Sequence, residues 1–97
     1  MVIISKTKLI EFYETENNAK EVLLVWYNVT LKCNWKDFNS IKQTFNSVDN
    51  IGNDRFVFNV GGNKYRIVAM IHFTTRTVYL RFVGTHKQYD KINCKTI

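Results

Sequence analysis

Apolar residues recur at helical spacing through the first half of the chain and alternate with polar residues through the second half. At the start, the apolar run Val2-Ile3-Ile4 predicts a short strand. Spacings of i, i+3, i+4 and i+7 then predict two helices. The first is expected from Ser5, as its N-cap, to about residue 14, and the second from Asn17 or Asn18 to about residue 32. A third, shorter helix is expected over residues 39–45.

The second half of the chain has the two-residue period of a sheet. Residues 47–54 are rich in Asn, Asp and Gly and predict a loop. From Arg55 to Val83 apolar and polar side chains alternate, which predicts three strands. The strands are separated by Gly61-Gly62 and Thr74-Thr75, which predict hairpin turns of two residues each.

Two-residue turns fix the expected register of the three strands. The first turn would pair Val60 with Asn63, and so Phe58 with Tyr65; the second would pair Ile71 with Val78. Because successive side chains on a strand point to opposite faces, both registers place the large apolar residues on one face. That expected core face carries Phe56, Phe58, Val60, Tyr65, Ile67, Ala69, Ile71, Phe73, Val78, Leu80 and Phe82.

The other face of the sheet is expected to be cationic and to carry no carboxylate. Its side chains would be Asn59, Lys64, Arg66, His72, Tyr79 and Arg81, interleaved with Val57, Val68, Met70 and Val83. In the expected register Val68 lies opposite Arg81 and Arg66 opposite Val83, so the two guanidinium groups are diagonal neighbours. Thr85 is expected to cap a short helix over residues 86–92, which follows this strand directly.

Composition and charge narrow the class of protein. A chain of 97 residues, 45% of them hydrophobic, suits one folded domain spanning residues 1–97. Fourteen basic residues against eight acidic ones leave a net charge of +6, which is typical of a protein that meets a polyanion or an acidic partner. The simpler alternative is a charged face that only keeps the protein in solution.

The two cysteines, Cys33 and Cys94, are too few for a disulfide scaffold and have no zinc-ligand spacing with the two histidines. They are expected to be free thiols in a reducing cytoplasm. No apolar run approaches the roughly 20 residues of a membrane span, and no secretion signal is recognisable. We therefore expect a cytoplasmic protein with no metal or other cofactor and no membrane partner.

The combination of His, Arg and Tyr on one face suits RNA cleavage. That reaction needs a deprotonated 2′-hydroxyl, a neutralised phosphate and a protonated leaving oxygen. Histidine ordinarily exchanges protons near neutral pH, whereas arginine is too basic for this role but can hold the phosphate. His86 and Tyr89 follow the arginine-bearing strand and are the expected partners of Arg66 and Arg81. His72, in the middle of the sheet pattern, is expected to be a bystander.

Two segments resemble HigB-type toxins of type II toxin–antitoxin systems. One is RFVFNVGGNKYRIV, residues 55–68, and the other is YLRFVGTHKQYDKI, residues 79–92. The resemblance implies an α+β fold like that of RelE, with two to three N-terminal helices on one face of a small, mainly antiparallel sheet and a short C-terminal helix. It also implies a ribonuclease that enters the ribosomal A site and cuts mRNA there.

The resemblance further implies a HigA-type antitoxin with a helix-turn-helix domain, through which alone the toxin would meet operator DNA. The implied catalytic residues are Arg66, Arg81, His86 and Tyr89. The arginines would hold the phosphate, His86 would transfer a proton, and Tyr89 would orient it or stack on a nucleotide. The expected RNA contacts are Asn59, Lys64, Tyr79 and Lys87.

Two other functions remain open from the sequence. The same basic face could serve a non-catalytic module that binds RNA or the ribosome, although such a module would not need His86 and Tyr89 beside the arginines. Relatives of this fold inhibit DNA gyrase instead of cutting RNA, and the T-H-x-x-Y-D ending at residues 85–90 argues against that class.

Overall fold

Ten short elements follow one another along the chain, and the computed structural model describes all residues from 1 to 97. They are β1 (Val2–Ile4), α1 (Thr7–Thr15), a 3₁₀ turn (Asn17–Ala19), α2 (Lys20–Lys32), α3 (Phe38–Thr44), β2 (Val48–Gly52), β3 (Arg55–Val60), β4 (Tyr65–His72), β5 (Thr77–Thr85) and α4 (His86–Tyr89).

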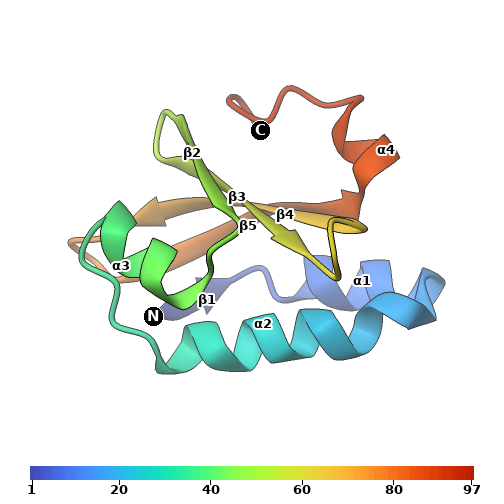
Figure 1. Cartoon of the computed structure of the whole chain (residues 1–97), viewed down its shortest axis with the longest axis horizontal. Coiled ribbons are helices and arrows are strands. Elements are labelled where there is room, and N and C mark those ends of the chain that lie inside the picture. The colour runs from blue at the N-terminus through green and yellow to red at the C-terminus, as the bar shows by residue number, and fades with distance from the viewer.

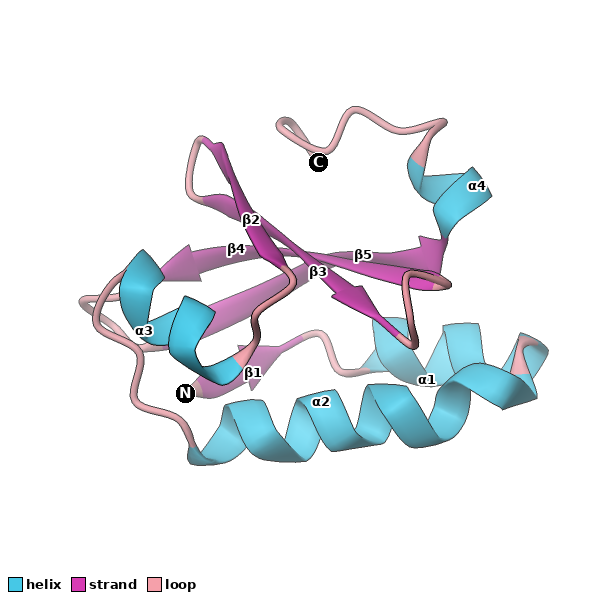
Figure 2. Ribbon diagram, viewed as in Figure 1, coloured by secondary structure: helices cyan, strands magenta, loops and turns pink.

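The five strands form one mixed sheet in the order β1-β5-β4-β3-β2. β1 runs parallel to β5, and the other neighbours are antiparallel. α1 and α2 lie against one face of the sheet, while α4 and the C-terminal segment lie on the other side (Figure 1). Figure 2 shows the same layers by element type. The expected α+β fold, with helices on one face and a short C-terminal helix, is therefore confirmed.

An aromatic cluster fills the core between the sheet and the helices. The Phe58 ring lies 5.2 Å from Trp26 of α2 and 6.0 Å from Trp35, measured between ring centroids, and Phe45 packs against all three. Phe56, two residues before Phe58 on the same face of β3, stacks on another aromatic ring from α3. Apart from Phe82, each member of the expected core face is buried or packed against the core.

The helices begin differently from the sequence prediction. Ser5 has a φ of 71° and forms the turn between β1 and α1, whose N-cap is Lys6. A left-handed residue cannot adopt the extended geometry of an N-cap, so the predicted Ser5 cap is wrong. The second helix opens with the 3₁₀ turn, and no side chain caps it. α3 starts one residue early because Asp37 caps it; two hydrogen bonds from Ser40 lower the pKa of that carboxyl.

The predicted loop over residues 47–54 is wrong in its larger part, because these residues contain β2. Val48 is fully buried and pairs with Phe58 of β3. Burial of this one side chain and the ladder to β3 outweigh the turn-forming composition around it. Only the end of the segment turns: Gly52, Asn53 and Asp54 have φ values of 86°, 55° and 60°.

The hairpin between β3 and β4 has a longer turn than predicted. Val60 pairs with Tyr65, and Phe58 with Ile67, so four residues (61–64) form the turn. Gly61, Gly62 and Asn63 all have positive φ, between 62° and 71°, and a run of three such residues is too long for a two-residue turn. The register is displaced by two residues, which leaves every side chain on its predicted face.

The hairpin between β4 and β5 follows the predicted register only at its start. Ile71 pairs with Val78 and Ala69 with Leu80, as expected, but Val68 then pairs with Phe82. Arg81 is therefore the extra residue of a β-bulge, and each side chain after it changes face. Phe82 lies on the face away from the core, whereas Val83 packs against the core. The predictions that Phe82 belongs to the core face and Val83 to the other are wrong.

A glycine follows the bulge, at a position with no room for a side chain. Gly84 lies opposite Arg66, and a Cβ added to it would come within 2.6 Å of both the Phe82 ring and the Gln88 Oε1 atom. That Oε1 atom accepts a hydrogen bond from the Thr85 backbone N–H, while the Thr85 hydroxyl accepts one from the Gln88 N–H. This capping box confirms Thr85 as the cap of α4. The helix ends at Tyr89, earlier than the predicted residue 92.

Gly84→Ala is expected to destabilise the fold by about 1–3 kcal/mol, because the Phe82 ring and the capping box would both have to move. Urea unfolding followed by circular dichroism measures the effect. A variant with the wild-type midpoint would show that Phe82 is free to rotate away, and that the bulge does not need glycine at this position.

Candidate functional site

The open face is the face of the sheet turned away from α1 and α2. Part of it is covered, because the C-terminal segment (residues 90–97) lies over it (Figure 1). Arg55 Nη2 donates a 2.7 Å hydrogen bond to the Ile97 carbonyl, and Asn53 Nδ2 donates one of 2.9 Å to the Lys95 carbonyl. Val57 and Val68 belong to this face and are nonetheless only 2% and 0% exposed. The remaining accessible part lies toward the turn of residues 61–64 and α4.

Arg66 is a nearly buried cation of the open face, and two backbone carbonyls fix its orientation. Its residue is only 9% exposed, and Nη1 donates to the carbonyl of Asn63 at 2.8 Å and to that of Tyr65 at 3.3 Å. Cζ lies 5.9 Å from the centre of the Tyr89 ring. Because only Nη1 has protein partners, the other guanidinium N–H groups remain available to an anion such as a phosphate.

Tyr89 connects α4 to the sheet. Its ring lies 6.5 Å from the Phe82 ring, and its hydroxyl donates to Cys94 Sγ at 3.3 Å. Burial and the contact with Cys94 raise the pKa of Tyr89 to about 12. At neutral pH the phenol therefore keeps its proton, which excludes a phenolate base and leaves Tyr89 able to donate a hydrogen bond or to stack.

The raised pKa of Tyr89 predicts a measurable titration. A folded-state value above the unfolded one means that Tyr89 stabilises the fold fully below about pH 10 and loses this contribution between about pH 10 and 12. The absorbance difference at alkaline pH between the wild type and Tyr89→Phe should show a midpoint near 12. In Cys94→Ala the midpoint should move down. An ordinary midpoint in the wild type would contradict the burial of this hydroxyl.

The sequence predicted an open face without carboxylates, and this prediction is wrong. Asp49 of β2 pairs with Val57 and therefore lies on this face, and its charge contributes to the raised pKa of Tyr89. The error follows from treating β2 as a loop. Asp54 also comes close, with its Oδ2 atom 4.0 Å from His72 Nε2.

His86 begins α4 and forms a pair with Asp90. Nδ1 lies 3.1 Å from Asp90 Oδ2, and both side chains are more than half exposed. A Nδ1–H that donates to a carboxylate leaves Nε2 as the acceptor and fixes the orientation of the ring. Sequence reasoning missed Asp90, although its position four residues after His86 in a short helix was a usable signal.

The turn of residues 61–64 meets the start of α4. The backbone N–H of His86 donates to the Lys64 carbonyl at 3.2 Å, so Lys64 and His86 share one end of the sheet. Asn59 pairs with Arg66 across β3 and β4, and its Nδ2 donates to the Ser47 carbonyl at 2.9 Å. Lys87 is exposed on α4. Five of the predicted residues thus lie around one corner of the sheet: Arg66, Tyr89, Lys64, Asn59 and His86.

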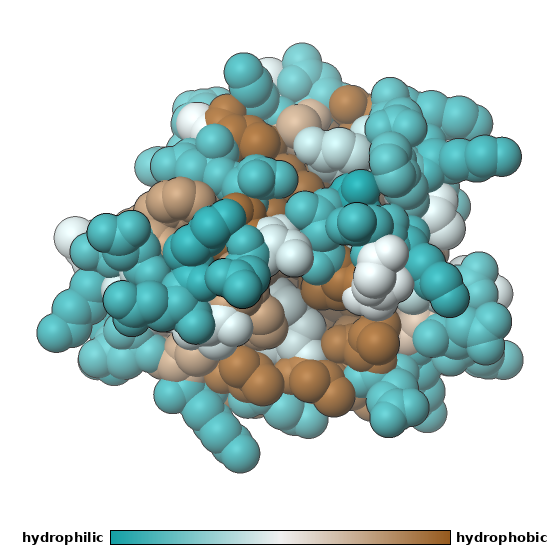
Figure 3. Space-filling model, in the orientation of Figure 1, coloured by the Kyte–Doolittle hydropathy of each residue, from teal (hydrophilic) through white to brown (hydrophobic).

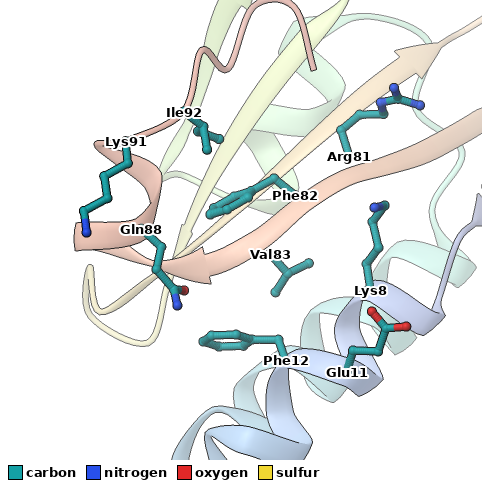
Figure 4. A pocket seen from close by; sticks show the side chains of 9 residues that line it. All are labelled: Lys8, Glu11, Phe12, Arg81, Phe82, Val83, Gln88, Lys91 and Ile92. Atoms are coloured by element: carbon teal, nitrogen blue, oxygen red, sulfur yellow. The ribbon is translucent and has the colours of Figure 1, made fainter.

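The sequence predicted that Arg81 lies diagonally beside Arg66, and this prediction is wrong. The bulge places Gly84, not Val83, opposite Arg66 and leaves Arg81 exposed at the edge of the sheet. There it lines a groove of about 520 Å³ that runs along β5 between α1 and the region of α4 (Figure 4). We call this the β5 groove. Its lining residues are Lys8, Glu11, Phe12, Arg81, Phe82, Val83, Gln88, Lys91 and Ile92.

Tyr79 and His72 lie toward the other end of the open face. Tyr79 pairs with Met70, four residues along β4 from Arg66, which corresponds to about 13 Å. Its ring packs edge-on against His72 at 5.3 Å. The predicted RNA contact Tyr79 is therefore separated from the corner that holds Arg66.

The surface is mostly hydrophilic, with smaller hydrophobic patches between the polar side chains in the view of Figure 3. Cys33 and Cys94 are both free thiols. The structure holds no group of three or more His, Cys, Asp or Glu side chains arranged to bind a metal ion. None of its helices combines the length and the apolar character of a membrane span.

Comparisons with known proteins agree with the resemblance seen in the two segments. Residues 19–92 match the family model described as HigB_toxin, a RelE-like toxic component of a toxin-antitoxin system. The mRNA interferase toxin HigB of Escherichia coli K12 is 38% identical over 92 residues, which cover 93% of this chain and 88% of that protein. The mRNA interferase HigB of the E. coli strain CFT073 is 29% identical over 94 residues, covering 95% of this chain and 91% of the relative. The chain belongs to the HigB family of toxins from toxin–antitoxin systems.

Proposed function

We propose that this toxin is a cytoplasmic, ribosome-dependent endoribonuclease that cleaves mRNA in the ribosomal A site and is neutralised by a HigA-type antitoxin with a helix-turn-helix domain. Its relatives at 38% identity carry the name mRNA interferase. Operator DNA would be contacted only through the antitoxin. The net charge of +6 supports binding to a polyanion.

The observation that carries the proposal is the guanidinium of Arg66. It is almost buried, is oriented by two carbonyls, and lies against Tyr89 at a corner to which α4 brings His86. A cation fixed before the substrate arrives needs no reorganisation when charge develops on a phosphate. A solvated arginine that only improved solubility would not need these contacts.

The proposed reaction is a transesterification within the RNA. The 2′-hydroxyl oxygen attacks the neighbouring phosphorus as His86 Nε2 takes its proton, and the bond from phosphorus to the 5′-oxygen breaks. The leaving 5′-oxygen takes a proton from the solvent. The products carry a 2′,3′-cyclic phosphate and a 5′-hydroxyl. Arg66 neutralises the phosphate in the transition state, and Asp90, through Nδ1, positions the imidazole.

The remaining predicted residues are proposed to bind RNA outside the reacting centre. Lys64 and Lys87 flank His86 and are suited to neighbouring phosphates, and Asn59 presents an amide beside Arg66. Tyr89, which keeps its proton at neutral pH, donates a hydrogen bond or stacks on a base. Since Arg81 lies at the edge of the sheet, we propose that it meets the RNA backbone some distance from the scissile phosphate.

Induced alone in a bacterium, the chain is expected to stop growth, and co-expression of its antitoxin should restore it. Purified toxin should cut mRNA on translating ribosomes and leave the two termini named above. Cleavage of free RNA at the same rate would show that the reaction does not depend on the ribosome. Growth arrest with intact mRNA and bound ribosomes would indicate the non-catalytic alternative, and arrest with inhibited supercoiling would indicate a gyrase inhibitor.

A further inference from the structure

The outer edge of β5 is unpaired along its second half. β1 pairs with β5 only from Thr77 to Tyr79, although β5 continues to Thr85. In the sheet order, β4 is the other neighbour of β5, so no strand covers the outer edge from Leu80 to Thr85. The Thr85 N–H at its end is bonded to Gln88 Oε1. A row of free backbone N–H and C=O groups on such an edge is a template for an added strand.

The β5 groove runs along this same edge, with an apolar wall on each side. Figure 4 shows Phe12 and Val83 on the side of α1, and Phe82 and Ile92 on the side of α4. The two walls come from opposite faces of β5, because Phe82 and Val83 are consecutive in the strand; the bulge decides that Val83 is the one that faces the core. A strand added here would direct alternate side chains toward the two walls, as in strand addition by peptides.

The rim of the groove is cationic. Lys8, Arg81 and Lys91 line it against a single acidic residue, Glu11. Lys8 and Lys91 are exposed at opposite ends of the view in Figure 4. This distribution favours an acidic occupant, since complementary charge raises both the rate of encounter and the selectivity.

We propose that an extended segment of the antitoxin, carrying apolar and acidic side chains, adds as a strand to the β5 edge at residues 80–85. Membership of the HigB family, whose members are components of toxin–antitoxin pairs, supplies the partner. The proposal therefore does not depend on the nuclease chemistry. A segment seated here covers Arg81 and stands beside α4, so it also hinders access of RNA to the corner that holds His86.

Hydrogen–deuterium exchange tests the added strand directly. The probe is the antitoxin encoded with this toxin, compared as the complex against free toxin. Outward amides between residues 80 and 84 should exchange rapidly in the free toxin and become protected in the complex; the Thr85 N–H already donates to Gln88 Oε1. Unchanged exchange there, with protection confined to β2 or to the outer surface of α2, would overturn the proposal even if the toxin is an active ribonuclease.

Charge reversal at the rim of the β5 groove tests whether the groove binds the antitoxin segment or RNA. The double variant Lys8→Glu/Lys91→Glu should raise the Kd for the antitoxin about tenfold at low salt. The control Lys32→Glu/Lys36→Glu changes the net charge equally, at exposed lysines away from the groove. It should change the Kd for the antitoxin less than about twofold. Cleavage by the free toxin should fall no further in the first variant than in the control. Weaker binding of a short oligoadenylate, with unchanged antitoxin affinity, would assign the groove to RNA and refute the proposal.

Discussion

Replacing His86 with alanine is expected to slow single-turnover cleavage of mRNA on programmed ribosomes by about 10²–10⁴. Nδ1 of the imidazole lies 3.1 Å from Asp90 Oδ2, so Nε2 is the nitrogen that can accept a proton. Both side chains are more than half exposed, and neither belongs to the core. The variant should therefore keep its thermal stability and its affinity for the antitoxin while losing toxicity.

His72→Ala is the matched control, because it removes the second imidazole of the chain from the far end of the open face. This variant should remain toxic. Asp90→Asn should lower the rate less than His86→Ala does, since the amide orients the imidazole less well than the carboxylate. Wild-type rates in His86→Ala would place the proton transfer on the ribosome, with Arg66 and Tyr89 as the remaining contacts.

Arg66→Ala is expected to reduce cleavage by about 10²–10³ through loss of the fixed charge at the phosphate. Because the side chain is nearly buried and its Nη1 atom satisfies two carbonyls, the substitution can also destabilise the corner. The melting temperature has to be measured with the rate. A loss of rate that is explained by unfolding at the assay temperature would count against a catalytic role.

Arg66→Lys separates charge from geometry. Lysine keeps the charge but lacks the planar fork that can bond a carbonyl and a phosphate together, so the rate should stay well below that of the wild type. Arg81→Ala gives the comparison at the edge of the sheet. It should weaken RNA binding more than it slows the bound complex. Equal losses of single-turnover rate from Arg66→Ala and Arg81→Ala would show that both reach the same phosphate.

Much of the fold follows from periodicity, and the errors share a cause. Alternation placed Phe58, Ile67 and Leu80 in the core correctly, because burial selects apolar side chains at every second position of a strand. A bulge adds one residue without changing composition, and the adjacent pair Phe82-Val83 was its only trace in the sequence. β2 was missed because a single buried valine outweighed a polar, turn-rich composition.

The sequence predicted most of the residues of the candidate site, but not how they are arranged. Arg66, Tyr89 and His86 do gather at one corner, since the strand end and the helix after it are consecutive in the chain. The position of Arg81 depended on an unbroken register and failed with it. Asp49 approaches Tyr89 from β2, a part of the chain far from Tyr89 in sequence, which local patterns cannot show. Cys94, five residues after Tyr89, reaches it because the chain turns back after α4.

The two tryptophans of the chain, Trp26 and Trp35, are 1% and 2% exposed and lie in the aromatic cluster under the sheet, on the face opposite Arg66 and Tyr89. Their fluorescence therefore reports on folding, and RNA bound at the open face would not contact them. Emission should be blue-shifted and shielded from iodide in the native protein, and should stay so when RNA or antitoxin binds. Tryptophan fluorescence, without any added label, can thus distinguish inactive variants that have lost only the site from those that have lost the fold.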